Sequence, residues 1–426
     1  MAINQTILQE CIRDQREMIE NAQIVERQVT FEPKGNYVFV GIRHSGKSYL
    51  LYQRIHQLLK SGHNWDEILF VNFDDERLAE FNTDDFNSLL EAHYSQSPKK
   101  PFIFLDEVQR IPHWELFARR LVNEKYIVYI TGSNAKMLSE EIATTLGGRF
   151  FIQYVYPYSF AEYLAAQDIV LSADWVKSTR KRSEIKRAFD SYFFYGGLPE
   201  ILDYTEKRSM LSSLYQKIYL GDICARYKIS DTRALSILVK KMAESVKQPI
   251  SYRRLHHIVE STGSKISLPK IIDYVGHTEE SWLTLSIQND IARLADKEST
   301  KKFYFIDNGL LNLFLFRDET SLLENMVAVE LVRRYGKENV SYYNAGGGEI
   351  DFVVPEAKMA IQVSYDLKNE DTLSRELSPL RKFQTAHPDW QCFIITFDTA
   401  GIYNDEEKEI KATPIWQWLL NAAGKV

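Results

Sequence analysis

Short apolar runs alternate with helix-like stretches through the first third of the chain. Four of these runs cover residues 37–41, 68–73, 102–106 and 126–132. Uninterrupted apolar strands separated by helices are typical of a parallel sheet that is covered on both faces. The pattern therefore predicts one α/β domain over residues 24–157, preceded by a separate helix over residues 1–23.

The pattern changes beyond residue 157. Residues 158–245 read as mainly helical and are predicted to form a helical lid and linker. Residues 246–320 combine two helices with a β-ribbon, in the layout of a winged helix. Residues 321–426 return to strands and helices. The predicted fold class is α/β, with a parallel-sheet core, a helical part, a winged helix and a C-terminal α/β domain.

The composition is ordinary for a soluble globular protein and excludes several functional classes. The chain has 52 Lys and Arg residues and 58 Asp and Glu residues, so its net charge is negative. Any nucleic-acid contact must therefore come from a local basic patch. Three cysteines without a C-x-x-C pair exclude a disulfide scaffold and a thiolate zinc site. The chain shows no signal peptide and no apolar stretch of about 20 residues, so a cytoplasmic location without a membrane span is predicted.

A phosphate-binding loop is predicted at 41–48, where GIRHSGKS fits G-x-x-x-x-G-K-[ST] between an apolar strand and a helix. Glycines let backbone N–H groups turn towards phosphate oxygens, and the helix N-terminus adds its positive dipole end. Lys47 is predicted to reach the β- and γ-phosphates, and Ser48 to bind Mg²⁺. The predicted nucleotide contacts are Gly41, Arg43, His44, Ser45, Gly46, Lys47, Ser48 and Tyr49.

A second motif, FIFLDE at 102–107, ends a buried strand with two carboxylates. Asp106 is predicted to hold Mg²⁺ through water, and Glu107 to orient or deprotonate the attacking water. The phosphate loop and this acidic pair together predict ATP or GTP binding. ATP is favoured, because no T/NKxD-type guanine motif occurs in a suitable context.

Further motifs resemble those of AAA+ ATPases. The fourth strand ends in TGSN at 131–134, and a helix ends in Gly-Gly-Arg at 147–149. With YPYSFAEYL at 156–164 and YGGLPEIL at 195–202, their order resembles one bacterial and archaeal group related to the signal-transduction STAND class. The resemblance implies an AAA+ core with a helical lid, in which residues 24–30 pack on the adenine.

The same resemblance implies roles for single residues. Ser133, with Asn134 beside it, would sense the γ-phosphate. Arg149 would point into the nucleotide site of a neighbouring subunit, which implies a homo-oligomer; the alternative is that Arg149 caps the end of its helix. Gly-Gly-x-Pro at 196–199 resembles the GxP element of the STAND class, and no arginine of a second sensor is recognised there.

The C-terminal half resembles the uncharacterised domain that follows the ATPase in this group. Within it, residues 247–306 have the layout of a winged helix and begin with a locally basic stretch. If residues 267–275 form a recognition helix, the residues around its start would face DNA. These candidates are Ser264, Lys265, Ser267 and Lys270. The open alternative is a winged helix that contacts protein or only packs.

The last part of the chain resembles a PD-(D/E)xK nuclease, the restriction-endonuclease type of fold. Active members use an Asp and a following E-x-K to hold Mg²⁺ and activate water. Glu330 and Asp351 match the acidic positions. The E-x-K positions read Gln362-x-Ser364, so one charged ligand and the lysine are missing. A degenerate fold that does not cut is therefore predicted, and nothing in the sequence brings Lys368 into the site.

These observations predict an AAA+-type ATPase that binds and hydrolyses ATP and uses the nucleotide state as a conformational switch or motor, with DNA as the expected partner. One alternative is a STAND-like regulatory or scaffold ATPase that acts through protein partners without nucleic acid. The other is a metal-dependent nuclease.

Overall fold

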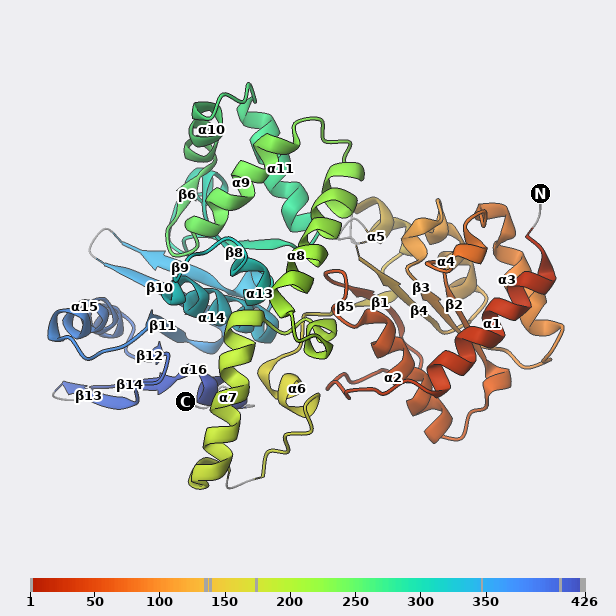
Figure 1. Cartoon of the computed structure of the whole chain (residues 1–426), viewed down its shortest axis with the longest axis horizontal. Helices are drawn as coiled ribbons and strands as arrows, with labels where there is room; N and C mark the ends of the chain where they lie inside the picture. The colour runs from red at the N-terminus through yellow and green to blue at the C-terminus, as the bar shows by residue number, and fades with distance from the viewer. Residues whose placement is uncertain are drawn as a thin grey trace. The chain divides into compact units, whose positions relative to one another are not determined.

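The computed structural model describes residues 3–133, 137, 140–172, 175–345, 348–405 and 408–421. The chain divides into two compact units, Met1–Tyr156 and Pro157–Val426 (Figure 1). None of the helices in these described ranges is both long enough and apolar enough to cross a membrane.

The first unit contains a parallel five-stranded sheet with the order β2-β3-β4-β1-β5. The strands are β1 (Asn36–Val40), β2 (Ile68–Asn72), β3 (Phe102–Asp106), β4 (Val128–Gly132) and β5 (Phe150–Tyr154). The helices are α1 (Gln5–Glu20), α2 (Lys47–Lys60), α3 (Phe86–Tyr94), α4 (Trp114–Asn123) and α5 (Glu140–Leu146). The predicted α/β core with a parallel sheet is confirmed.

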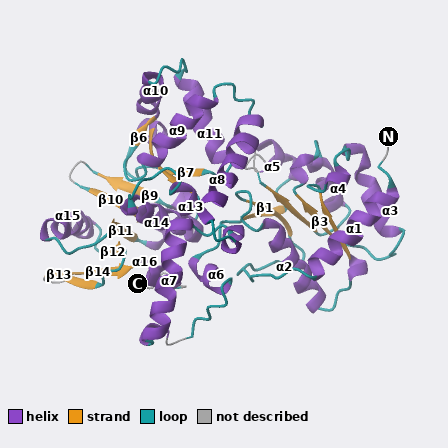
Figure 2. Cartoon of the chain, viewed as in Figure 1, coloured by secondary structure: helices purple, strands orange, loops and turns teal. Residues whose placement is uncertain are grey.

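Strands β1 to β4 of this sheet are mostly buried because helices lie on both of its faces (Figure 2), whereas the edge strand β5 is largely exposed. Every residue of β1 and of β4 is buried. Phe104 and Tyr129 stack with ring centroids 4.6 Å apart, and both belong to one core cluster with Phe39. Since all five strands run parallel, the carboxyl ends of β1, β3 and β4 meet at one edge, which is where ligands bind in such sheets.

The second unit begins with helices. They are α6 (Phe160–Ala165), α7 (Thr179–Tyr195), α8 (Lys207–Lys217), the π-helix η8 (Ile218–Ala225) and α9 (Thr232–Glu244).

Residues 232–305 form what we call the three-stranded module. After α9 it contains β6 (Ile250–Ser251), α10 (Tyr252–Ser261), α11 (Leu268–Glu280), β7 (Thr284–Ile287), α12 (Leu294–Ser299) and β8 (Thr300–Phe305). Its strands are antiparallel in the order β6-β8-β7. Helices α10 and α11 pack against each other and against α9.

A six-stranded sheet with the order β13-β14-β12-β11-β10-β9 completes the second unit. Its strands are β9 (Ser341–Asn344), β10 (Glu349–Val354), β11 (Met359–Ser364), β12 (Gln391–Thr396), β13 (Gly401–Asp405) and β14 (Lys408–Pro414). The helices are α13 (Asn308–Leu311), α14 (Glu319–Tyr335), α15 (Glu370–Ala386) and α16 (Ile415–Leu420). Helix α14 packs on both β8 and β11, so it lies between the module and this sheet.

Candidate nucleotide-binding site

The phosphate loop joins the end of β1 to the start of α2. Gly46 has the left-handed backbone conformation, with φ 90°, directly before Lys47 begins α2. A Cβ atom at Gly41 would lie 2.1 Å from the carbonyl oxygen of Val155, the residue after β5. The backbone therefore requires both glycines, one for its φ angle and the other for the close approach of a second segment.

Lys47 is 4% exposed, and its ammonium is enclosed by the loop. Its Nζ donates hydrogen bonds to the carbonyl oxygens of Gly41 and Ile42, at 3.2 and 3.0 Å. A carboxylate oxygen of Glu107 lies 3.9 Å from the same nitrogen. Phosphate oxygens are stronger acceptors than neutral carbonyls, so an ammonium at this helix N-terminus can hold a phosphate group.

The remaining predicted contacts of the loop differ in exposure. Ser45 is fully buried, whereas Arg43 and His44 are half-buried. Tyr49, on α2, is 51% exposed and its ring lies beside that of Tyr52.

Asp106, the last residue of β3, is fully buried. Its Oδ1 accepts a 2.5 Å hydrogen bond from the hydroxyl of Thr131, at the end of β4. Burial raises the pKa of Asp106 to about 6, with the charge of Glu107 as the second cause. The hydroxyls of Thr131 and Ser48 oppose this shift. The fold therefore holds a carboxylate where its charge is costly unless a cation or a donor compensates it.

Glu107 follows with a left-handed backbone, φ 52° and ψ 37°. A residue other than glycine adopts this conformation at a cost, and such strain is common at functional sites. The N–H of Glu107 donates to the hydroxyl of Thr131 at 2.9 Å, and its carboxylate accepts from the amide of Gln109. These contacts fix the carboxylate near Lys47.

Thr131 and Gln109 were missed by the sequence analysis. Leu105 pairs with Ile130 between β3 and β4, so the next residues, Asp106 and Thr131, lie side by side. Thr131 thus donates to Asp106 and accepts from the N–H of Glu107. The only indication in the sequence was a hydroxyl at the end of an apolar strand, and its meaning depends on the strand register.

Ser133 is 2% exposed and follows β4. Its hydroxyl accepts a 3.4 Å hydrogen bond from Gln109, the same amide that donates to Glu107. Asn134, the other predicted sensor residue, lies outside the described residues. The structure therefore connects one of the two predicted sensor residues to the carboxylate of Glu107 through a shared side chain.

The side chains of this site fit a nucleotide with Mg²⁺. Ser45 Oγ and Asp106 Oδ2 are buried and have no hydrogen-bond partner in the part of the chain that the structure describes. Buried polar atoms are rarely left in this condition unless a ligand, ion or water completes them. Carboxylate and hydroxyl oxygens, which Asp106 and Ser48 offer, are the protein ligands that Mg²⁺ prefers.

Arg27 is a further residue that sequence reasoning missed. Its guanidinium donates to the carbonyl oxygens of Ser45, at 2.8 Å, and of Tyr156, at 2.9 Å. Its backbone exchanges two 2.8 Å hydrogen bonds with the amide of Gln53 on α2. The segment predicted to pack on the adenine, residues 24–30, is therefore tied directly to the phosphate loop.

Arg149 is exposed and follows two glycines with positive φ, Gly147 and Gly148. Its guanidinium donates to the side chain of Asn123, the last residue of α4. Its carbonyl oxygen accepts from the amide of Asn36 at 3.2 Å. Within one chain, the guanidinium of Arg149 thus contacts the end of α4.

The residues predicted to face DNA lie around the start of α11. Lys265, Ser267 and Lys270 are exposed, and Ser264 is half-buried. Ser267 is the residue that precedes the first turn of this helix.

Of the four residues predicted for a degenerate nuclease site, Asp351 and Gln362 lie together. They are cross-strand neighbours, because Phe352 on β10 pairs with Ile361 on antiparallel β11. Gln362 donates to Glu376 on α15 at 2.7 Å. Ser364, the third predicted residue, donates its hydroxyl hydrogen to the carbonyl oxygen of Asp366. Lys368, which the sequence did not place in the site, is exposed.

Glu330 forms its ion pairs elsewhere. Its carboxylate lies 2.7 Å from Arg334 and 3.5 Å from Arg333, both on α14. The acid of α14 that shares a partner with Asp351 is Glu324: both lie within 3.4 Å of the ammonium of Lys302. Lys302 was missed because it lies on β8, outside the segment predicted to be nuclease-like, where the motif spacing gives no information.

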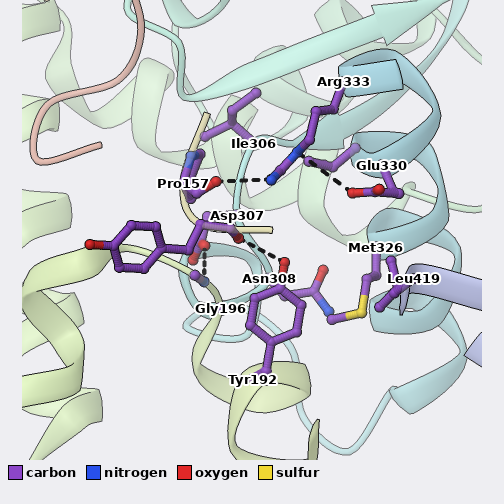
Figure 3. A pocket seen from close by; sticks show the side chains of 13 residues that line it. Pro157, Tyr192, Gly196, Ile306, Asp307, Asn308, Met326, Glu330, Arg333 and Leu419 are labelled. Carbon is purple, nitrogen blue, oxygen red and sulfur yellow. Dashed lines mark hydrogen bonds and ion pairs between the residues drawn. The ribbon is translucent and has the colours of Figure 1, made fainter. Parts of the chain in front are cut away.

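Glu330 and Arg333 line a small pocket together with Gly196 and Gly197, the two glycines of the Gly-Gly-x-Pro motif (Figure 3). A Cβ atom at Gly196 would lie 2.0 Å from Oδ1 of Asp307, and the N–H of Gly197 donates to Oδ2 at 2.7 Å. Asp307 is buried, which raises its pKa to about 6 against the effect of this N–H. In this unit the two glycines therefore provide the space and the donor that Asp307 requires.

Comparisons with known proteins find similar sequences and structures. A family model described as an AAA domain matches residues 34–164, and one described as a domain of unknown function matches residues 186–321. An uncharacterized protein of Methanocaldococcus jannaschii is 30% identical over 433 residues, covering 97% of this chain and 95% of that protein. An uncharacterized protein of Haemophilus influenzae is 29% identical over 340 residues, covering 78% and 82%. The Walker-type ATPase of Pyrococcus abyssi matches at 13% identity and a TM-score of 0.39, covering 72% of this chain and 94% of that one.

Proposed function

We propose that this chain, which belongs to one family with the archaeal relative and matches the AAA domain model over residues 34–164, binds ATP with Mg²⁺ and hydrolyses it to switch between conformations. The observation that supports this proposal is the convergence of Lys47, Asp106 and Glu107 at the carboxyl end of one parallel sheet. An ammonium, a buried carboxylate and a strained glutamate are the groups that phosphate binding, metal binding and water activation need.

In the proposed reaction, a water oxygen bonds to the γ-phosphorus, the bond to the β-phosphate oxygen breaks, and ADP and phosphate leave. Lys47 would donate to the β- and γ-phosphate oxygens, and Ser48 and Asp106 would hold Mg²⁺. The metal supplies positive charge against the phosphates. Glu107 would accept the proton of the attacking water, while Thr131 keeps both carboxylates in position through its two hydrogen bonds.

We also propose that Ser133, with Asn134, senses the γ-phosphate, since Ser133 shares Gln109 with Glu107. A γ-phosphate that changes the position of Glu107 would then also change the position of Gln109 and of Ser133 at the end of β4. Arg149 is proposed to act on the nucleotide of a neighbouring subunit in a homo-oligomer. Its exposed position supports this role, because an arginine that acts on another chain must reach the surface.

DNA is the proposed partner of the second unit. The element order of the three-stranded module, helix-strand-helix-helix-strand-helix-strand with a β6-β8-β7 sheet, supports a winged helix in which the short helix α12 joins the last two strands. Arg253 and Arg254 on α10 are exposed, as are Lys265 and Lys270 around the start of α11, and these cations could meet phosphates. All three cysteines are buried free thiols, which supports the proposed cytoplasmic location.

The main alternative is a regulatory ATPase that binds protein partners and no nucleic acid. DNA affinity measured against salt concentration separates the two, because each phosphate contact adds about one unit to the slope of log affinity against log salt. Lys265→Ala with Lys270→Ala should flatten this slope, whereas the exposed lysines Lys358 and Lys368, changed in the same way, serve as the control. An absence of DNA binding even at low salt would favour the protein-partner function.

ATP hydrolysis itself is tested by turnover with and without DNA, measured at several protein concentrations. The proposed switch requires measurable Mg²⁺-dependent hydrolysis, and a chain that binds no nucleotide would overturn the proposal. A metal-dependent nuclease is the less favoured function, because Gln362 and Ser364 occupy the positions where catalysis needs an acid and a lysine.

A further inference from the structure

One buried cluster of the second unit lies outside the proposed ATPase machinery. Lys302, on β8, is fully buried, and three carboxylates hold its ammonium. The Nζ atom lies 2.7 Å from Glu349, 3.2 Å from Glu324 and 3.4 Å from Asp351. A charge removed from water this completely is tolerated only with partners of this kind.

The cluster joins elements that are distant in the sequence. Lys302 belongs to the three-stranded module, Glu324 to α14, and Glu349 and Asp351 to β10 of the six-stranded sheet. Tyr304, also fully buried on β8, donates a 2.9 Å hydrogen bond to the carboxylate of Glu324. Polar contacts therefore attach the module to the six-stranded sheet at this point.

The oxygen atoms around Lys302 are those of a site for a hard cation. Gln362 is 8% exposed, and its Oε1 has no hydrogen-bond partner among the described residues. As the cross-strand neighbour of Asp351, Gln362 projects from the same face of the sheet. Carboxylate and amide oxygens that outnumber the available positive charges are typical of sites for divalent ions such as Mg²⁺ and Mn²⁺.

A divalent metal nevertheless does not fit beside the lysine. The resemblance to a nuclease fold would place a metal at Asp351 and Gln362, but the ammonium of Lys302 already lies 3.4 Å from this aspartate. Like charges at such a separation repel strongly away from water. In the described ranges, only His256, His257 and Glu260 form a group of three ligand residues close enough to share an ion, and they lie on α10.

We propose that Lys302 is the resident cation of this site. Its ammonium occupies the position that the resemblance to a nuclease fold assigns to a divalent metal, and its ion pairs fasten the three-stranded module to the six-stranded sheet. In the native chain the site is closed to Mg²⁺ and Mn²⁺, and it opens to them when the ammonium is removed.

The test measures Mn²⁺ binding to the full, nucleotide-free chain by electron paramagnetic resonance. Lys302→Met removes the charge and keeps the length of the side chain, and Lys301→Met on the same strand is the matched control. Lys302→Met should gain one Mn²⁺ site that binds at least about ten-fold more tightly than any site of the native chain, as expected when a competing charge is removed. Mn²⁺ should also raise its unfolding temperature, and adding Asp351→Asn should abolish both effects.

Two results would overturn the proposal. One is Mn²⁺ binding by the native chain that Asp351→Asn removes, which would show that a metal and the lysine share the site. The other is a folded Lys302→Met chain that gains no Mn²⁺ site. If Lys302→Met does not fold alone, Mn²⁺ should rescue its refolding, and a failure of this rescue counts against the proposal.

Discussion

Two buried aspartates, Asp106 in the first unit and Asp351 in the second, show what separates an open binding site from a closed one. Burial raises the pKa of both carboxyl groups. Asp106 Oδ2 has no hydrogen-bond partner in the described part of the chain, whereas Lys302 and the N–H of Val363 occupy both oxygens of Asp351. A buried carboxylate is thus available to an outside ligand only where the fold leaves one oxygen without a partner.

The two buried lysines of these sites differ in the same way. Lys47 donates to neutral carbonyls of the phosphate loop and stays 3.9 Å from Glu107. Lys302 has three carboxylates within 3.4 Å. Phosphate oxygens can replace the neutral carbonyl acceptors of Lys47, whereas three carboxylates of the chain neutralise the charge of Lys302.

The largest expected effect tests whether the nucleotide site of Lys47, Asp106 and Glu107 needs an arginine from a neighbouring subunit. Arg149→Ala should keep ATP affinity and lower hydrolysis by about 10³–10⁵, as for other arginines supplied to a phosphoryl group. Turnover per native subunit should rise with protein concentration. Mixing Arg149→Ala with Lys47→Met should restore part of the activity, because the second variant still supplies its arginine.

Arg119→Ala, which changes another exposed arginine of the first unit, is the control for this experiment. Turnover that does not depend on protein concentration, together with no rescue on mixing, would contradict the proposed role. The chain would then work as a monomer, and Arg149 would act only through its contact with Asn123.

Glu107→Gln should have the next largest effect. An amide cannot accept the proton of the attacking water, so hydrolysis should fall by about 10²–10⁴ while ATP affinity stays the same. Single-turnover hydrolysis and equilibrium nucleotide binding measure the two quantities, with Glu124→Gln at the exposed end of α4 as the control. An equal loss of binding and hydrolysis would mean that Glu107 has a structural role.

Matched changes at the two lysines sharpen the comparison directly. Lys302→Met should lower the free energy of unfolding of the second unit by about 3–5 kcal/mol, because buried carboxylates lose their counter-ion, and should leave ATP affinity unchanged. Lys47→Met should weaken ATP binding by about 100-fold, since charged hydrogen bonds contribute about 1.5–3 kcal/mol each. Denaturant unfolding and nucleotide titration give these values. Lys47→Met should change the free energy of unfolding little. A large loss of stability in Lys47→Met, or a loss of ATP affinity in Lys302→Met, would contradict this comparison of the two lysines.

The smallest expected effect concerns the residue that joins the two acids of the open site. Thr131→Val keeps the shape of the side chain and removes both of its hydrogen bonds, to Asp106 and to the N–H of Glu107. Hydrolysis should fall by about ten-fold, since neutral hydrogen bonds contribute about 1 kcal/mol each and the two acids keep other contacts. A steady-state assay detects this change, and unchanged hydrolysis would show that Thr131 only packs.

The candidate site of the first unit was predictable to a large extent. The spacing of the phosphate loop and the acidic pair predicted that Lys47 and Glu107 would meet, because carboxyl ends of parallel strands share one edge. Thr131 and Arg27 were not predictable, since their roles depend on strand register and on backbone carbonyls that any residue could offer.

The acidic position on α14 was harder to assign. All residues from Ser321 to Val332 are buried, so this helix has no polar face that would indicate which acid points towards the sheet. Glu324 and Glu330 were therefore equivalent in the sequence pattern. Only the packing of α14 on both β8 and β11 brought Glu324 to Lys302 and left Glu330 to pair with Arg333 and Arg334.

The sequence by itself determined the local requirements of this protein: apolar strands that must be covered, glycines where the backbone turns or approaches closely, and a loop that can hold phosphate. Those properties depend on residues that are neighbours in the sequence, so they can be recognised without the fold. The tertiary structure alone decided which buried charged groups can bind an outside ligand and which are neutralised by partners within the chain. Lys302 lies 22 and 49 residues from Glu324 and Asp351. The energy of a buried charge depends on groups within a few ångströms in space, whatever their separation along the chain.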